Sequence, residues 1–410
     1  MALQIFTNIS LLVNTRVIDG LIRGKKLSNL PCLKNAYIII ENDTISEIGK
    51  MDQFRFSKEQ KRLQDNTIVL PGWCDSHTHL VFAGSREEEF IDKIKGLSYA
   101  EIAEKGGGIL NSAKKLNETS EDELFKTALK RLEEVSKLGT GAIEIKSGYG
   151  LSMEGELKML RVIKKLKEAS DITIKSTFLG AHAFPPEYKE NHQGYVDCII
   201  NKMLPVIAKE KLADYIDAFC EQGFFSAEEM KIICEAGKNY GLKPKLHVNQ
   251  LNSIGGVETG ISLNALSLDH LETLTTNEIK LLGNYDGSCT LLPTATFFLR
   301  SALPPARELI NVGAAVTLAS DYNPGSSPSG NMNFAISLSC IQMKMLPEEA
   351  INAATINGAC AMEIEKDLGS IAVGKKANLI FTKPVPSLSY LPYSFGSNLI
   401  DKVMIKGSFI

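Results

Sequence analysis

Eight short apolar runs, rich in β-branched residues, recur between residues 66 and 364 and alternate with stretches that carry helical signals. This alternation constrains the fold most, because strands separated by helices assemble into parallel sheets. Eight strands is the count of a (β/α)8 TIM barrel, and a doubly wound open sheet is the alternative. The expected strands are Thr67–Val69 leading to Trp73, Ala142–Ile145, Ile172–Phe178, Tyr215–Phe219, Lys245–Val248, Ala265–Leu268, Ser288–Leu292 and Ala315–Leu318.

Helix start signals lie between these runs. Ser120 with Glu123, and Ser226 with Glu229, have the spacing of a capping box, in which each side chain satisfies a backbone N–H at the start of a helix. The proline pair at 304–305 predicts the start of a further helix, since proline is favoured in the first turn. These signals support the alternating pattern.

Both ends of the chain have only short β-like runs and no helix-length amphipathic pattern. Because chain termini often lie close together, we expect the two ends to form one composite β domain. We therefore predict a β-sandwich part from 1–65, a TIM-barrel catalytic domain over 66–364, and the second β-sandwich part from 365–410. The expected strands are Gln4–Ile9, Leu11–Val13, Ala36–Ile40, Thr44–Ile48, Ala377–Phe381 and Val403–Gly407, with a hairpin turn at Glu41–Asp43.

Composition excludes several classes of function. The net charge of −3 argues against a nucleic-acid partner and against a polybasic membrane anchor. No apolar run approaches the roughly 18 residues of a membrane-spanning helix, and the N-terminus lacks the features of a signal peptide. The eight cysteines have no CxxC spacing. We interpret them as small buried residues with reduced thiols, and we expect a cytoplasmic protein.

Each expected strand stops in a short polar cluster. In a parallel barrel the carboxyl ends of all strands share one rim, where active sites are built. Five of the six histidines fall on this rim, whereas His192 lies in a polar loop and is expected at the surface. The clusters are HTH (77–79), KSGYG (146–150), GAHA (180–183), CEQG (220–223), HVNQ (247–250), DHLE (269–272), PTAT (293–296) and SDYNPGS (320–326).

His77 and His79 are two residues apart, so both side chains point to the same face of a strand. Two imidazoles at that spacing can converge on one ion, and neutral imidazole suits zinc or iron. His247 and Asp321, at the fifth and eighth strand ends, can supply the third and fourth ligands. A His-x-His pair alone is also compatible with one core and one surface histidine, but the two further strand-end residues favour a metal site.

Several long motifs resemble the metal-dependent amidohydrolase superfamily, in particular its imidazolonepropionase family. They are PGWCDSHTHL (71–80), HLVFAGSREEEF (79–90), GGGIL (106–110), EIKSGYGL (144–151), TFLGAHAFPPEY (177–188), LDHLE (268–272), DYNPGSSPSGNM (321–332) and DLGSIAVGKKANLIF (367–381), with Asn378 where aspartate is more usual. The resemblance implies a TIM barrel with a composite β-sandwich, one zinc or iron ion per subunit and a homodimer.

The resemblance also implies an activity, the hydrolysis of the cyclic amide 4-imidazolone-5-propanoate to N-formimidoyl-L-glutamate in histidine degradation. It places the metal on His77, His79, His247 and Asp321. Asp321 would also take a proton from the attacking water, and His270 would orient that water or hold developing charge. His182 would polarise the substrate carbonyl or bond the ring oxygen.

The remaining rim residues are expected to bind substrate. The planar guanidinium of Arg86 suits the propionate, and a surface pair with Glu87, Glu88 or Glu89 is the alternative. Tyr149 can close over the ring or bond its carboxylate. The full set of expected substrate-binding residues is Arg86, Tyr149, His182, Gln250, Asn323, Gly325 and Ser326, the last at a position where the family often has threonine.

Gln250 separates two subclasses of activity. Ring deaminases on this scaffold use a glutamate at H-x-x-E to shuttle protons, whereas glutamine cannot do so near neutral pH. Gln250 therefore favours ring opening over a purine- or pterin-type aminohydrolase, although another cyclic amidohydrolase or a non-catalytic metal-binding protein stays an alternative. Lys146 raises a further alternative, a carbamylated lysine bridging two metals. Asn249 also departs from the acidic residue common in the family.

Overall fold

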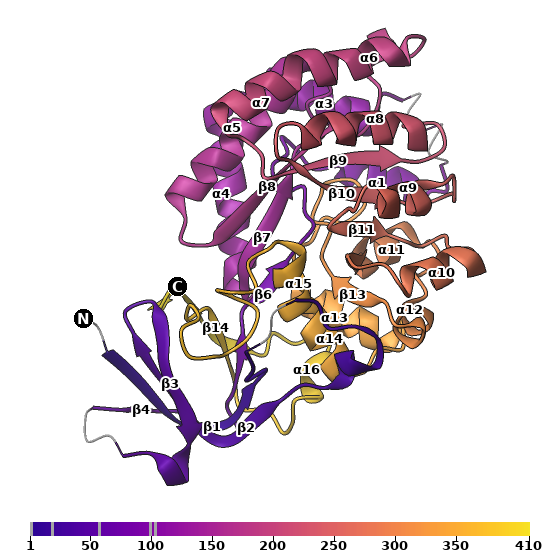
Figure 1. Ribbon diagram of the computed structural model, residues 1–410. Helices are drawn as coiled ribbons and strands as arrows, with labels where there is room; N and C mark the ends of the chain where they lie inside the picture. The colour runs from indigo at the N-terminus through magenta and orange to yellow at the C-terminus, as the bar shows by residue number, and fades with distance from the viewer. Residues whose placement is uncertain (1–2, 18–19, 56–58, 98–100, 102–104) are drawn as a thin grey trace.

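The computed structural model describes residues 3–17, 20–55, 59–97, 101 and 105–410. Its larger part is a parallel sheet in which each of eight strands pairs with the next along the chain (Figure 1). Thr78, just beyond the first strand, forms a bridge to Tyr322, just beyond the last, so the sheet closes at this rim. This confirms the (β/α)8 barrel over the doubly wound sheet. The strands are β6 (Trp73–Asp75), β7 (Thr140–Lys146), β8 (Thr173–Ala181), β9 (Tyr215–Cys220), β10 (Lys243–Val248), β11 (Ser267–His270), β12 (Ser288–Leu291) and β13 (Ala315–Leu318).

Helices surround the barrel (Figure 1). Ser226 and Glu229 form the expected capping box at α8, and the Ser120 side chain accepts the Glu123 amide at the start of α4. The helix expected after the proline pair starts at Ala306. The helices are α1 (Glu87–Ile94), α3 (Ile109–Glu118), α4 (Glu121–Lys137), α5 (Met153–Ala169), α6 (His192–Cys198), α7 (Leu204–Glu210), α8 (Ala227–Lys238), α9 (Gly256–Ser262), α10 (Thr276–Leu282), α11 (Pro293–Leu299), α12 (Ala306–Val312), α13 (Met332–Ile341), α14 (Pro347–Ala354), α15 (Ile356–Ala361) and α16 (Tyr390–Tyr393).

A separate mixed sheet is built from both ends of the chain, as expected. Its strands follow the order β16-β15-β14-β5-β1-β2-β3, and β4 pairs with β1. The hairpin turn expected at Glu41–Asp43 connects β2 to β3. The strands are β1 (Leu3–Val13), β2 (Cys32–Glu41), β3 (Thr44–Lys50), β4 (Lys61–Arg62), β5 (Ile68–Pro71), β14 (Leu379–Thr382), β15 (Ile400–Ile405) and β16 (Ser408–Phe409).

The strand expected at Thr67–Val69 is wrong as the first strand of the barrel. Ile68–Pro71 pairs with β1 and β14 of the mixed sheet, and the barrel begins at Trp73. The chain passes between the two sheets at Gly72, where an added Cβ would lie 3.3 Å from the Cα of Gly141. Apolar β-branched residues suit either sheet, so composition did not indicate which one this run joins. The division at residues 66 and 364 otherwise stays a prediction.

Asn378 joins the mixed sheet to the barrel. Its buried side-chain amide donates to the carbonyl of Gly141 in β7 at 3.0 Å and accepts from the Lys406 amide at 2.8 Å. An aspartate would lack the N–H that the Gly141 carbonyl accepts. Asparagine is therefore well matched to this position.

We expect Asn378→Ala to lower the free energy of unfolding by about 1–3 kcal/mol, because it leaves the buried Gly141 carbonyl and the partly buried Lys406 amide without this partner. Chemical denaturation measures this change, with the exposed Asn239→Ala as the control. An unfolding free energy equal to that of the control variant would contradict the role of Asn378 as a link between the two sheets.

Candidate active site

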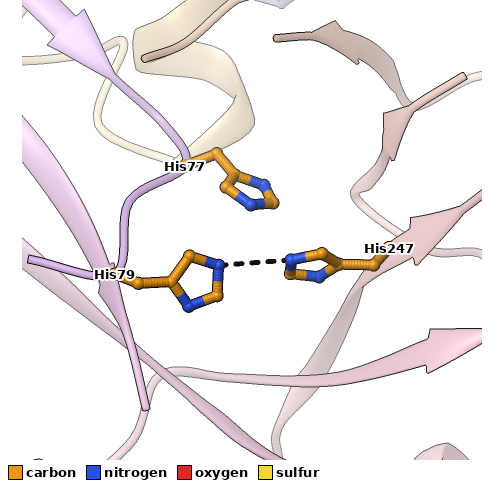
Figure 2. Close-up of side chains that lie close together, drawn as sticks. All are labelled: His77, His79 and His247. Carbon is orange, nitrogen blue, oxygen red and sulfur yellow. Dashed lines mark hydrogen bonds between the residues drawn. The ribbon is translucent and has the colours of Figure 1, made fainter. Parts of the chain in front are cut away.

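Three histidines converge at the rim of the barrel (Figure 2). His77 and His79 follow β6, and His247 lies in β10. One ring nitrogen from each histidine lies within 4.8 Å of the other two, with 3.3 Å between the Nε2 atoms of His79 and His247. Asp321, directly after β13, completes the group: its Oδ1 lies 3.6 Å from His77 Nε2 and 3.7 Å from His79 Nε2. The structure therefore brings together all four expected metal ligands.

The other ring nitrogen of each histidine has an oxygen partner. His77 Nδ1 lies 2.6 Å from Asp269 Oδ2, His247 Nδ1 lies 2.8 Å from Asp217 Oδ2, and His79 Nδ1 lies 3.3 Å from the Ser147 carbonyl. A carbonyl oxygen only accepts, and an ionised carboxylate also only accepts, so each Nδ1 carries the proton. The Nε2 lone pairs are thus the ones that face one another.

This arrangement fits a bound cation. Burial lowers the pKa of His77, His79 and His247 well below the usual histidine range, so the rings are neutral. The buried Nε2 of His77 has no hydrogen-bond partner. Three neutral nitrogens and one carboxylate are a donor set that zinc and iron accept.

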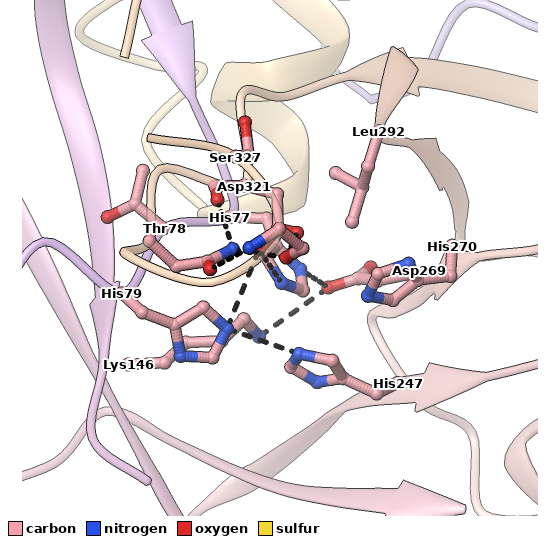
Figure 3. A network of polar contacts seen from close by, with 12 residues as sticks. His77, Thr78, His79, Lys146, His247, Asp269, His270, Leu292, Asp321 and Ser327 are labelled. Atoms are coloured by element: carbon pink, nitrogen blue, oxygen red, sulfur yellow. Dashed lines mark hydrogen bonds and ion pairs between the residues drawn. The ribbon is translucent and has the colours of Figure 1, made fainter. Parts of the chain in front are cut away.

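Lys146 links the carboxylates that support this group, and Figure 3 shows it beside one of them, Asp269. Its Nζ is 2.9 Å from Glu144 Oε1, 2.8 Å from Asp217 Oδ2 and 3.5 Å from Asp269 Oδ2. Burial alone would lower the pKa of Lys146, but these three carboxylates together raise it above its ordinary value. Carbamylation needs a neutral amine, so this ammonium argues against the bridged two-metal site. Among the described residues, no second group of three potential ligands lies close together.

Asp321 and His270 have unusual backbone conformations at the rim. Their φ angles are 53° and 86°, in the left-handed region that residues other than glycine rarely adopt. The Asp321 amide donates to the His77 carbonyl at 3.0 Å, and the preceding Ser320 is held by the buried Asp75. Burial raises the pKa of Asp321 to about 6. His270 Nδ1 lies 3.4 Å from Glu272, and His270 and Asp321 line one small cavity.

A cavity of about 510 Å³ opens above this group. It is lined by every expected substrate-binding residue, and a smaller cavity, lined by His79, His247 and Asp321, shares several of them. His192, by contrast, is partly exposed at the end of α6, as expected. The lining residues of the large cavity include Arg86, Tyr149, His182, Gln250, Asn323, Gly325 and Ser326.

Arg86 lies within ion-pair distance of Glu89, one of the alternative partners, but neither side chain is at the surface. Its side chain is 12% exposed, its Nε donates to Ser112 Oγ at 2.8 Å, and Glu89 is 4.0 Å away. The Nη2 group is buried without a hydrogen-bond partner. The guanidinium therefore retains a donor at the cavity that suits an anionic group.

Comparisons with known proteins agree with this geometry. A profile described as the Amidohydrolase family matches residues 68–410. The imidazolonepropionase of Flavobacterium johnsoniae is 57% identical over 390 residues, or 95% of each chain. That of Christiangramia forsetii is 53% identical over 406 residues, which cover 98% of this chain and 99% of the relative. The chain belongs to the imidazolonepropionases of the amidohydrolase family.

Solved structures of more distant proteins have the same fold. Escherichia coli guanine deaminase has a TM-score of 0.74 and 12% identity, and the match covers 100% of this chain and 99% of that one. A triazine hydrolase variant has a TM-score of 0.76 and 15% identity, with 100% and 94% covered. At these identities the likeness shows the fold alone.

Sequence reasoning missed the residues that support this amidohydrolase site. Asp217 and Asp269 hold two of the histidines, and Glu156 and Glu221 accept backbone amides of rim loops. Asp217 and Asp269 could have been found as charged residues inside apolar strands, since such residues are buried and paired in most proteins. The identity of each partner, however, depends on strands far apart in the sequence.

The structure also gives an account of Asn249. Its φ is 56°, and its buried amide donates to Glu278 Oε1 at 2.7 Å and to the Thr273 carbonyl at 2.8 Å. An acidic residue at position 249 would lie against the carboxylate of Glu278, so asparagine is compatible with this neighbour.

We expect Asp269→Asn to weaken metal binding about 10- to 100-fold, because His77 loses the ionised acceptor that fixes its ring and raises its basicity. Competition between the apoprotein and a chelator for Zn²⁺ or Co²⁺ measures the affinity. Asp214→Asn, at the entry to β9 and paired with Lys167, is the matched control and should bind metal as the wild type does. Equal affinity of the two variants would contradict the support by Asp269.

Proposed function

We propose that the chain hydrolyses the ring C–N bond of 4-imidazolone-5-propanoate and releases N-formimidoyl-L-glutamate. One observation carries this proposal: His79, His247 and Asp321, which lie against the buried His77, line a small cavity that shares Gln250 and Asn323 with the larger cavity lined by Arg86. The relatives that are 53–57% identical are named for this reaction. The product formed belongs to histidine degradation.

We propose that His77, His79, His247 and Asp321 hold one zinc or iron ion. Such an ion, when bound, lowers the pKa of water and polarises an amide carbonyl. Asp321 would take a proton from the attacking water, since its carboxylate lies against the metal-binding histidines and can accept a hydrogen bond. Its Oδ2 lies 3.3 Å from Ser326 Oγ, a contact that orients the carboxylate.

His182 is better placed to accept a hydrogen bond than to polarise the carbonyl. Its Nδ1 lies 2.8 Å from the Gly148 carbonyl and therefore carries the ring proton. Burial lowers the pKa of His182 to about 4, so Nε2 has a lone pair and no proton. We assign to His182 the recognition of a substrate ring N–H, and to His270 the orientation of the water or the stabilisation of developing charge.

The anionic tail of the substrate would lie at Arg86. Its guanidinium is 5.9 Å from the centre of the Tyr149 ring, and the two side chains lie on the same cavity wall. Asn323 Oδ1 accepts the amides of Gly325 and Ser326, both at 2.8 Å, which fixes the turn after Asp321. We propose that this turn and Tyr149 bind the carboxylate end and the ring.

Gln250 distinguishes this proposal from deamination. Its amide lines both cavities and offers one donor group and one acceptor to a cyclic amide, but no transferable proton. Gln250 is therefore a stronger indication of the reaction type than the similarity of the fold to guanine deaminase. A purine or pterin aminohydrolase would need another group to return a proton to the leaving nitrogen.

We also propose that the protein acts as a homodimer in the cytoplasm, on a small-molecule substrate and without nucleic acid or membrane. The family resemblance supports the dimer, and the lack of CxxC spacing among the eight cysteines and a net charge of −3 support the other features. Within the described residues, no helix has the length and apolar character needed to span a bilayer. Light scattering on the purified protein measures the subunit count.

The proposed function predicts that metal-loaded protein converts 4-imidazolone-5-propanoate to N-formimidoyl-L-glutamate, and that it leaves purines and pterins unchanged. Asp321→Asn should lower kcat about 100- to 10,000-fold while the circular dichroism spectrum is unchanged. Product detection by mass spectrometry decides between the activities. Release of ammonia from a purine, with imidazolone propionate untouched, would refute the assignment.

Arg86→Met should raise KM about 10- to 100-fold and change kcat little, because it removes charged hydrogen bonds to a part of the substrate that does not react. Steady-state kinetics at saturating metal measure both constants. The exposed Arg62→Met on β4 is the matched control. A substrate KM equal in the two variants would place the propionate elsewhere.

A further inference from the structure

The loop between β7 and α5, residues 147–152, contacts three of the proposed site residues at once. It carries Tyr149, which lines the substrate cavity. The Ser147 carbonyl accepts from His79 Nδ1 at 3.3 Å, and the Gly148 carbonyl accepts from His182 Nδ1 at 2.8 Å. The position of this loop therefore determines the position of one metal ligand and two substrate-binding side chains.

Glu156, near the start of α5, holds the loop through its backbone amides. The carboxylate is wholly buried and does not line the cavity. Its Oε2 accepts from the Gly148 amide at 2.9 Å, and its Oε1 accepts from the amides of Gly150 at 2.7 Å and Leu151 at 3.1 Å. Burial raises the pKa of Glu156 to about 7, and the three backbone donors favour its ionised form, whose hydrogen bonds are stronger than neutral ones.

The packing around these bonds is close. A Cβ at Gly150 would lie 2.3 Å from the Glu156 amide nitrogen, and a Cβ at Gly155 would lie 2.7 Å from the Gly150 Cα. The φ of Leu151 is 45°, an uncommon value for leucine. The loop is therefore held against α5 in one conformation, and the carboxylate supplies the acceptors that its amides need.

Asn117 of α3 holds the same loop from the other side. Its amide donates to the Gly150 carbonyl at 2.8 Å, and its Oδ1 accepts from Ser152 Oγ at 3.1 Å. Unlike Glu156, it makes a neutral hydrogen bond and is only partly buried. Asn117 should therefore help to hold the loop in the same position as Glu156 does, but with a smaller effect.

We infer that Glu156 is a positioning residue for substrate binding: it fixes the loop that places the Tyr149 phenol and, through the Gly148 carbonyl, the ring of His182. Glu156 itself contacts neither the substrate cavity nor a metal ligand. The sequence patterns predicted no role for it. This inference rests on the proposed function, because Tyr149 and His182 are the residues through which it acts.

Glu156→Gln tests the inference. The side chain keeps its shape, but its new Nε2 donor group would face one of the amide N–H groups that the carboxylate accepts. We expect KM to rise about tenfold or more, with kcat within about threefold of the wild type, since bound substrate is misplaced before the reaction. Metal content should stay the same. Calorimetric affinity for imidazole-4-propionate, which has the side chain but no ring amide, should fall by a similar factor.

Two comparisons separate positioning from simple stabilisation. Glu349→Gln is the matched control, because Glu349 is also buried, accepts the Leu346 amide at 2.7 Å and pairs with Arg307 outside the cavity. It should lower Tm and leave KM unchanged. In a Tyr149→Phe background, Glu156→Gln should raise KM by a smaller factor than it does alone.

The outcomes are distinct. An unchanged KM and an unchanged probe affinity in Glu156→Gln would overturn the inference, and so would full additivity with Tyr149→Phe. If Glu156→Gln does not fold, Asn117→Ala decides: a smaller KM rise supports the inference, and a wild-type KM overturns it. A wild-type protein that binds the probe but opens no imidazolone ring would overturn the proposed function alone, because the probe affinities would still test Glu156.

Discussion

The contact between the Lys146 ammonium and three buried carboxylates is the interaction on which the site depends. Two of these carboxylates, Asp217 and Asp269, each hold a histidine in the tautomer that a metal needs. Lys245, 3.1 Å from Glu144, adds a second cation to the group. Charges inside a protein are tolerated only when each has a partner, and loss of one partner leaves the others uncompensated. Where many barrels fill this layer with branched apolar side chains, this one has ion pairs.

Two kinds of support therefore surround the cavity. The metal ligands lie at the ends of strands and are held from beneath by ion pairs. Several substrate-binding residues lie on loops, and two of these loops are held by glutamates that accept backbone amides. Glu156 does this for the loop with Tyr149, and Glu221 does it for the residues after Gln250, accepting from Leu251 at 2.8 Å and Asn252 at 3.1 Å. Both supports fix geometry before any ligand binds.

Sequence patterns predicted the barrel, the composite sheet and the metal-binding group, because strand alternation and the strand-end histidines are local signals. They failed at Thr67–Val69, since an apolar run does not indicate which of two sheets it joins. They also missed Asp217, Asp269 and Glu156, whose roles arise from partners on other strands and loops. The tautomer of His182, too, depends on a carbonyl in the preceding loop, and periodicity carries no information about it.

In the part of the chain that the structure describes, the barrel closes through the bridge between Thr78 and Tyr322, with backbone bonds from the Asp321 amide to the His77 carbonyl and from the His79 amide to the Tyr322 carbonyl. Two metal ligands follow the first strand and one follows the last, so they face each other across this seam. An ion bound there would link the first strand of the barrel to the eighth. The bound ion would therefore stabilise the closed barrel as well as take part in the reaction. It could bind in this way only after nearly the whole catalytic domain has been synthesised, because its ligands come from both ends of that domain.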